Sequence, residues 1–209
     1  MVRGSLITFE GIDFSGKTVQ ANLLKERLIA EGLPVVFLRE PGGTEISEKI
    51  REVLLDTNHH KMVAATEVLL YAAARAQLVA ESVIPQLKKG SIVICDRYYD
   101  STTAYQGYAR KIDLAFIKSL NKFVSQKIEP DLTFLLDLEP EKALRRKDLS
   151  ASSPDRLERE DLKFHKRVRE GYLDIARREP HRFIIINGDR PINLIQEEIF
   201  KHTKSRLKI

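Results

Sequence analysis

The sequence predicts an α/β fold, a three-layer sandwich in which helices flank a five-stranded parallel sheet. Five short apolar runs recur between stretches of helical periodicity, at residues 6–9, 35–38, 92–95, 132–136 and 183–186. Apolar runs of this length are typical of strands buried on both faces, and their alternation with helices indicates parallel βαβ units. Because ligands bind outside the carboxyl ends of such strands, we expect functional residues directly after the apolar runs.

The helices are predicted from apolar residues spaced three and four apart. Val19, Leu23 and Leu28 share one face of the first helix. Residues 62–87 predict a longer helix that is apolar almost all round, so either the core or a second copy of the chain must cover it. Residues 148–155 contain three serines and a proline and are predicted to form a mobile loop.

Length and composition exclude several classes of protein. The 209 residues suit one domain over 1–209, since single cores stop growing only near ~250 residues. Lys and Arg total 35 against 30 Asp and Glu, and this excess favours anionic ligands. The charges are interleaved by sign, so nucleic acid is not an expected partner. Because Cys95 is the single cysteine and no run of ~18 apolar residues occurs, we expect a cytoplasmic protein without a membrane span.

The segment after the first apolar run carries the most specific motif. Residues 11–18 read Gly-Ile-Asp-Phe-Ser-Gly-Lys-Thr and match G-x-x-x-x-G-K-[ST] between a predicted strand and a predicted helix. This phosphate loop, or P-loop, binds ATP through backbone N–H groups, while Lys17 reaches the β and γ oxygens and the Thr18 hydroxyl holds Mg²⁺. The expected ATP-binding residues are Gly11, Ile12, Asp13, Phe14, Ser15, Gly16, Lys17 and Thr18. A chance match to a glycine-containing turn is the alternative.

Charged residues follow the next two strands. Asp96 ends the third apolar run, where a carboxylate would hold Mg²⁺ together with Thr18, or would cap the following segment. Arg39 and Arg97 come at successive strand ends, so their guanidinium groups would point into one cleft and grip a phosphate. Two surface salt bridges are the alternative.

Together, these motifs resemble the thymidylate kinase family, particularly its bacterial members. The resemblance runs nearly end to end and rests on residues 9–11 (FEG), 39–44 (REPGGT), 96–98 (DRY), 101–107 (STTAYQG) and 155–158 (DRLE). It implies a P-loop NTPase fold, transfer of the γ-phosphoryl group of ATP to dTMP with Mg²⁺, and a homodimer.

The resemblance also implies an acceptor site. It assigns dTMP binding to Asp13, Arg39, Pro41, Tyr71, Arg75, Arg97, Ser101, Thr102, Tyr105 and Gln106. Tyr71 is expected to stack on thymine and Arg75 to donate to O4, while Thr102 and Gln106 contact the base edge near N3. Asp13 approaches the 3′-hydroxyl of the deoxyribose. The alternative for Tyr71 is an ordinary core position.

On the donor side, the resemblance places Arg145 against the adenine ring and a lid around residues 147–160. The catalytic residues are then Lys17, Arg97, Asp13 and Arg156. Because no variable position of the P-loop is basic, Arg156 is expected to supply the further cation that the transition state requires. The alternative is that Arg156 pairs with Glu160 on a helix and contributes only to stability.

Two positions depart from the family pattern. Phe14 stands where bacterial members commonly have glycine, and Val19 replaces a common Thr or Ser. Two other functions stay open. Phe14 leaves open a nucleotide-binding module with weakened catalysis, and a kinase for another pyrimidine monophosphate stays open because one hydrogen bond or methyl contact discriminates such substrates by only a few kcal/mol.

Overall fold

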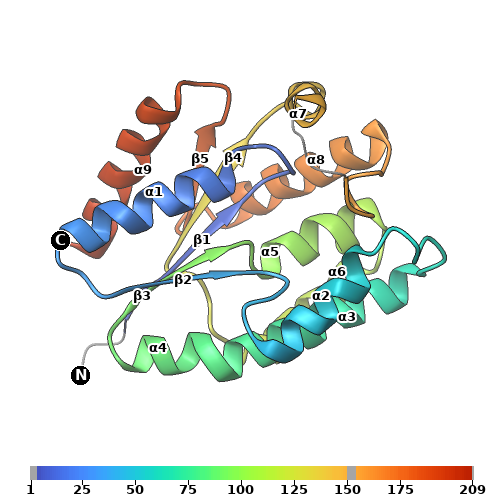
Figure 1. Cartoon of the computed structure of the whole chain (residues 1–209), viewed down its shortest axis with the longest axis horizontal. Coiled ribbons are helices and arrows are strands. Elements are labelled where there is room, and N and C mark those ends of the chain that lie inside the picture. The colour runs from blue at the N-terminus through green and yellow to red at the C-terminus, as the bar shows by residue number, and fades with distance from the viewer. Residues whose placement is uncertain (1–3, 150–153, 209) are drawn as a thin grey trace.

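The computed structural model describes residues 4–149 and 154–208, and these residues are built around one parallel sheet. Its strand order is β2-β3-β1-β4-β5 (Figure 1). The strands are β1 (Leu6–Glu10), β2 (Val35–Arg39), β3 (Ile92–Asp96), β4 (Leu132–Asp137) and β5 (Phe183–Asn187). All five predicted strands and their parallel pairing are confirmed. β1 and β3 are fully buried, which is why both read as continuous apolar runs.

Helices cover both faces of the sheet, as the three-layer prediction requires. On one face lie α1 (Lys17–Ala30) and α9 (Ile192–Leu207), which pack on alternate residues of β1, β3 and β4 (Figure 1). The other face carries α3 (Ala64–Leu78), the π-helical turn η1 (Val79–Val83) and α4 (Ile84–Lys88). Beside them lie α5 (Tyr99–Thr102), the π-helical segment η2 (Thr103–Ala109) and α8 (Leu162–Arg178).

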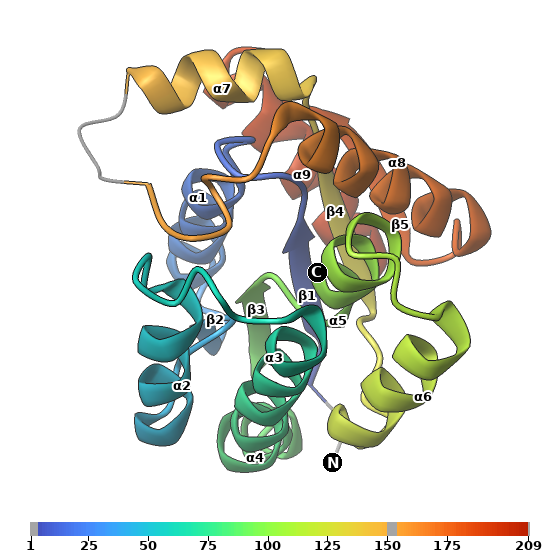
Figure 2. The same ribbon diagram turned by 90° about the vertical axis from the view of Figure 1, so that its right-hand side faces the viewer.

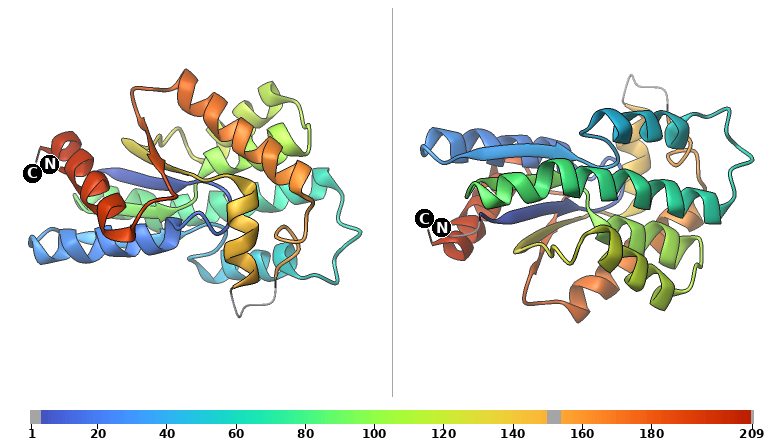
Figure 3. Two further views of the ribbon diagram at one scale, coloured as in Figure 1. Left: turned by 90° about the horizontal axis from the view of Figure 1, so that it is seen from above. Right: turned by 90° about the horizontal axis from the view of Figure 1, so that it is seen from below.

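Three more helices lie at the edges of these two layers. α2 (Glu45–Leu55) packs against α3, and α6 (Leu114–Val124) packs against η2 (Figure 2). α7 (Pro140–Asp148) crosses the carboxyl ends of the central strands (Figure 3). The mobile loop predicted at 148–155 falls largely on residues 150–153, which lie outside the described residues.

The long helix predicted at 62–87 is present as the continuous run Ala64–Lys88, which is long and apolar enough to span a membrane by composition alone. Its inner residues Leu78, Val79 and Val83 are fully buried against the sheet. The outer face is not covered by the described chain, and Leu69 there is 54% exposed. The structure therefore leaves an apolar stripe on α3 facing outward.

Candidate functional site

The P-loop spans the turn between β1 and α1. Gly11 has φ +139° and lies so close to the Leu136 carbonyl that a Cβ atom would approach it to 2.5 Å, so glycine is required there. The Lys17 ammonium is buried and donates to the Ile12 carbonyl at 2.8 Å. Burial and the neighbouring Arg97 lower the pKa of Lys17 to about 8. Lys17 is thus held inside the loop, facing the space where phosphate oxygens would lie.

Phe14, the unusual residue of the loop, also has a left-handed backbone, with φ +60°. Its ring packs partly against the apolar cluster of η2 and α8 and lines the cavity described below. Its carbonyl accepts a hydrogen bond from Arg146 of α7 at 3.3 Å. Phe14 therefore joins the lip of the P-loop to α7.

The residues predicted to hold Mg²⁺ are in contact. The Thr18 hydroxyl at the start of α1 donates to Oδ2 of Asp96 at the end of β3. The two meet because β1 and β3 are neighbours, with Phe9 in register with Asp96. No cluster of three or more His, Cys, Asp or Glu suited to a metal occurs in 4–149 and 154–208. One hydroxyl and one carboxylate fit Mg²⁺, which takes few protein ligands and completes its shell with phosphates and water.

A cavity of about 660 Å³ opens at the carboxyl ends of β1, β2 and β3. This volume lies within the range of small-ligand sites. Its lining combines P-loop residues with the predicted acceptor residues: Asp13, Phe14, Gly16, Lys17, Thr18, Arg39, Pro41, Tyr71, Asp96, Arg97, Ser101, Thr102, Tyr105 and Gln106. The structure thus brings these residues to one cavity from four separate segments of the chain, 13–18, 39–41, 71 and 96–106. Six other predicted site residues do not line it: Gly11, Ile12, Ser15, Arg75, Arg145 and Arg156.

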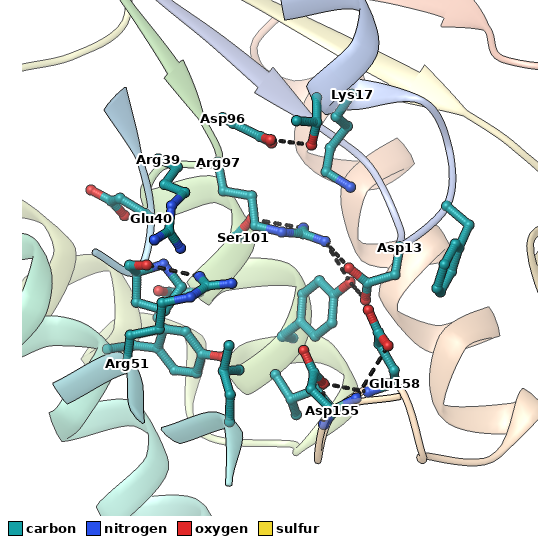
Figure 4. Close-up of a pocket in the computed structure, with 18 of the residues that line it drawn as sticks. Asp13, Lys17, Arg39, Glu40, Arg51, Asp96, Arg97, Ser101, Asp155 and Glu158 are labelled. Carbon is teal, nitrogen blue, oxygen red and sulfur yellow. Dashed lines mark hydrogen bonds and ion pairs between the residues drawn. The ribbon is translucent and has the colours of Figure 1, made fainter. Parts of the chain in front are cut away.

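Arg97 is the centre of the polar network in this cavity (Figure 4). Its backbone is left-handed, with φ +71°, which turns the side chain toward the P-loop. The guanidinium donates to Asp13 Oδ1 at 2.5 Å and to the Gly11 carbonyl at 2.9 Å. Burial alone would raise the pKa of Asp13, but Arg97 and Lys17 hold it well below its usual range. Asp13 is therefore ionised and fixed beside the cation expected to bind the acceptor phosphate.

Glu10 is a site residue whose role sequence analysis missed. It is fully buried at the end of β1 and accepts hydrogen bonds from Ser101 Oγ at 2.6 Å, the Tyr172 hydroxyl at 2.9 Å and the Tyr98 N–H at 2.8 Å. Burial, together with the nearby carboxylate of Asp100, raises the pKa of Glu10 to about 7. Glu10 thus orients the segment after β3.

A second missed residue, Arg51, lies on α2 and lines the cavity with Arg39. Arg51 donates to the Pro41 carbonyl at 2.8 Å, and Arg39 pairs with Glu48 at 2.9 Å. Burial and the positive charge of Arg39 lower the pKa of Arg51. In the sequence, Arg51 is one of several charged residues on a predicted helix whose pattern is typical of a solvent-exposed face. Only its position shortly after the REPGGT segment at 39–44 could have indicated a functional role.

Arg75 departs from its expected position. It is 2% exposed, is not among the residues that line the cavity, and pairs with Glu40 at 2.6 Å. It also donates to Thr102 Oγ1 at 2.9 Å, and Thr102 does line the cavity. Arg75 therefore supports the cavity wall from behind in this structure, and its direct contact with a base stays a prediction.

Arg145 also departs from the expected arrangement. Its side chain is exposed on α7 and does not line the cavity, whereas the adjacent Arg146 does. Arg146 donates to the carbonyls of Phe14 and Gly188, at 3.3 and 2.9 Å. The helix geometry turns neighbouring residues by about 100°, so only one of the two can face the P-loop. The adenine contact assigned to Arg145 stays a prediction.

Arg156 lies beside the cavity but does not line it. It pairs with Glu67 of α3 at 2.6 Å and donates to the Leu54 carbonyl at 2.8 Å. The alternative, in which Arg156 pairs with Glu160 on a helix, is wrong in its geometry, because residues 156–160 form turns and Glu160 pairs with Arg110 at 2.6 Å. Nη2 of Arg156 is buried without a partner among residues 4–149 and 154–208, so one donor of the guanidinium is free.

The arrangement defines a class of protein. A P-loop at a parallel strand end, a hydroxyl–carboxylate pair suited to Mg²⁺, and a second set of arginines across one cavity belong to a P-loop phosphotransferase with separate donor and acceptor sites. Comparison with known proteins then gives the family. The model of the family described as thymidylate kinase matches residues 9–199.

Individual relatives are similar to this chain over nearly its whole length. The thymidylate kinase of Caldanaerobacter subterraneus subsp. tengcongensis is 46% identical over 207 residues, covering 99% of this chain and 98% of that protein. The thymidylate kinase of Pelobacter propionicus is 49% identical, covering 94% and 92%. The crystal structure of thymidylate kinase from Ehrlichia chaffeensis superposes with a TM-score of 0.79 at 36% identity, covering 97% and 99%. The chain belongs to the thymidylate kinase family, a family of phosphotransferases, and its P-loop fold is confirmed.

Proposed function

We propose that the chain transfers the γ-phosphoryl group of Mg²⁺-ATP to dTMP, giving dTDP and ADP. The observation that carries this proposal is the single cavity in which Lys17 of the P-loop, Asp96 and Arg97 converge from neighbouring strand ends. The donor phosphates would lie on the P-loop and the acceptor phosphate beside Arg97. An in-line transfer needs both phosphates in one space beside cations, and Lys17, Arg39 and Arg97 all line this cavity.

The residues divide into roles by position. Lys17 holds the β and γ oxygens of ATP, and Thr18 with Asp96 would hold Mg²⁺, which neutralises charge on the phosphates. Arg97 and Arg39 grip the acceptor phosphate, for which guanidinium groups offer matched donors. Asp13 is placed to accept from the 3′-hydroxyl of the deoxyribose. The base would lie against Tyr71, Ser101, Thr102, Tyr105 and Gln106, all of which line the same cavity.

The test is ADP release from Mg²⁺-ATP with a panel of nucleoside monophosphates. The proposal expects dTMP to give turnover far above AMP, and dUMP to follow dTMP within a few kcal/mol, since one methyl contact discriminates weakly. If dTMP gives no more ADP than buffer or AMP, the proposal fails. Turnover only with another pyrimidine monophosphate would support the second candidate. Binding of ATP and dTMP without turnover would support the module with weakened catalysis.

We further propose that the protein is a cytoplasmic homodimer. The outward stripe of α3, where Leu69 and Ala73 are exposed, offers an apolar surface that a second copy would cover. Its small alanines allow two helices to approach closely. The free, buried Cys95 and the use of ATP suit a reducing compartment.

A further inference from the structure

Glu67 of α3 is a buried carboxylate that contacts three residues from two other segments of the chain. It is 1% exposed. Oε1 accepts from Gln106 Nε2 at 2.9 Å and from Arg110 Nε at 3.1 Å. Oε2 accepts from Arg110 Nη2 at 3.1 Å and pairs with Arg156 Nη1 at 2.6 Å. A carboxylate offers about four acceptor positions, so all of them are occupied and the group cannot rotate freely.

The charge of Glu67 determines which end of the Gln106 amide faces it. Burial opposes ionisation of Glu67, but the hydrogen bonds from Arg110 and Gln106 outweigh it and lower its pKa. An ionised carboxylate only accepts hydrogen bonds, and a carbonyl turned toward it would be repelled. The Gln106 amide must therefore present its NH₂ group to Glu67, whatever the nucleotide present.

The other end of the amide is then available to a ligand. Gln106 lines the cavity, and its Oε1 has no hydrogen-bond partner among residues 4–149 and 154–208. Tyr71, proposed to stack on the base, follows Glu67 by one helical turn and lines the same cavity. The base edge would thus meet a fixed acceptor. Thymine and uracil carry a hydrogen on N3 and can donate to it, whereas N3 of cytosine only accepts.

We infer that Glu67 is a positioning residue for base selectivity: it locks the Gln106 amide with its carbonyl toward the cavity, and thereby favours pyrimidines that carry N3–H over cytosine. The inference rests on the proposed function, because it assumes a nucleoside monophosphate in this cavity. This role can be distinguished from a purely structural one, because the loss of a purely structural contact would change kcat/KM for all acceptor nucleotides by similar factors.

The decisive variant is Glu67→Gln, which keeps the size of the side chain but offers either an NH₂ group or a carbonyl to Gln106. The Gln106 amide can then turn. We expect the ratio of kcat/KM for dCMP to that for dTMP to rise at least about tenfold, mainly through a higher KM for dTMP, while KM for ATP stays within about twofold. Glu67→Asp, which keeps the carboxylate, is expected to retain the wild-type ratio.

The matched control is Arg110→Lys, which also alters the hydrogen bonds of this cluster but keeps a cation beside the carboxylate, so that Glu67 stays ionised and faces Gln106. It is expected to lower the melting temperature without changing the dCMP to dTMP ratio. An unchanged ratio in folded Glu67→Gln, or an equal change in Arg110→Lys, would overturn the inference. Absence of dTMP turnover in the wild-type protein would instead overturn the proposed function.

A measurement on the wild-type protein covers the case in which Glu67→Gln does not fold. The side-chain NH₂ signals of Gln106, assigned by comparison with Gln106→Glu, should show slow hydrogen exchange with and without dTMP, because the NH₂ group stays on Glu67. Fast exchange in the free protein, or loss of protection when dTMP binds, would show that the amide is not locked and would contradict the inference.

Discussion

Replacement of Arg156 by alanine separates a catalytic role from a structural one. In the structure, Arg156 is 9% exposed at its side chain and pairs with Glu67 at 2.6 Å. Removing the only partner of a buried charge costs about 3–5 kcal/mol. Glu67 keeps Arg110 and Gln106, so we expect a smaller loss of unfolding free energy, about 1–3 kcal/mol. For a chain of this length, that lowers the melting temperature by roughly 2–12 °C.

The expected effect on activity is larger than the effect on stability. If Arg156 stabilises charge on the transferring phosphoryl group, Arg156→Ala lowers kcat by roughly 10²–10³, equal to about 3–4 kcal/mol, and leaves dTMP affinity nearly unchanged. Steady-state kinetics should be run well below the melting temperature of the variant. Arg159→Ala is the matched control, because Arg159 is exposed and, within the described part of the chain, its side chain donates only to the Pro154 carbonyl. A kcat within threefold of wild type for folded Arg156→Ala would remove Arg156 from the mechanism.

Three further predictions concern the acceptor site, the P-loop and the apolar stripe of α3. Arg75→Ala leaves Glu40 buried and unpaired, so urea unfolding should show a loss of unfolding free energy of about 3–5 kcal/mol. Calorimetric titration should show dTMP binding weakened by about 1–3 kcal/mol, with little change in ATP binding. Unchanged stability would contradict the ion pair between Arg75 and Glu40. The pKa of Lys17 is about 8, and only the protonated ammonium attracts phosphate. We therefore expect kcat/KM for ATP to be constant below pH 8 and to fall about tenfold per pH unit above it. A profile that stays flat up to about pH 9.5 would show that the pKa of Lys17 is not lowered. The wild-type chain should sediment as a dimer and Leu69→Glu as a monomer; a wild-type monomer at all concentrations would refute the homodimer.

The parts of the fold and site predicted from sequence are those set by local pattern. The central strands β1, β3 and β4 are buried along almost their whole length, and such strands leave continuous apolar runs, whereas β2 and β5 at the edges are only partly buried. The P-loop requires glycine at position 11 because the Leu136 carbonyl lies close, and this requirement is visible as a motif. The contact between Thr18 and Asp96 could be predicted from the sequence, because neighbouring parallel strands bring their carboxyl ends to the same edge of the sheet.

The parts that could not be predicted from the sequence are ion pairs and hydrogen bonds between residues that lie far apart in the chain. Arg75 pairs with Glu40, 35 positions away, which places its guanidinium behind the residues that line the cavity. Nothing in the helical pattern of 64–78 marks Glu67 as the partner of Arg156, which follows 89 positions later. Glu10 precedes the P-loop and reads as part of its motif, yet its role comes from Ser101 and Tyr172, which only folding brings near. Such pairings are set by tertiary packing and leave no periodic signal.

The contacts of Glu67 also have a thermodynamic consequence for the two substrates. One carboxylate touches Gln106, which lines the acceptor side, and Arg156, which carries the charge proposed for the donor side. A ligand that moves the carboxylate affects both contacts, because Gln106 binds its Oε1 and Arg156 binds its Oε2. Linkage is reciprocal, so the factor by which ATP changes the affinity for dTMP must equal the factor by which dTMP changes the affinity for ATP.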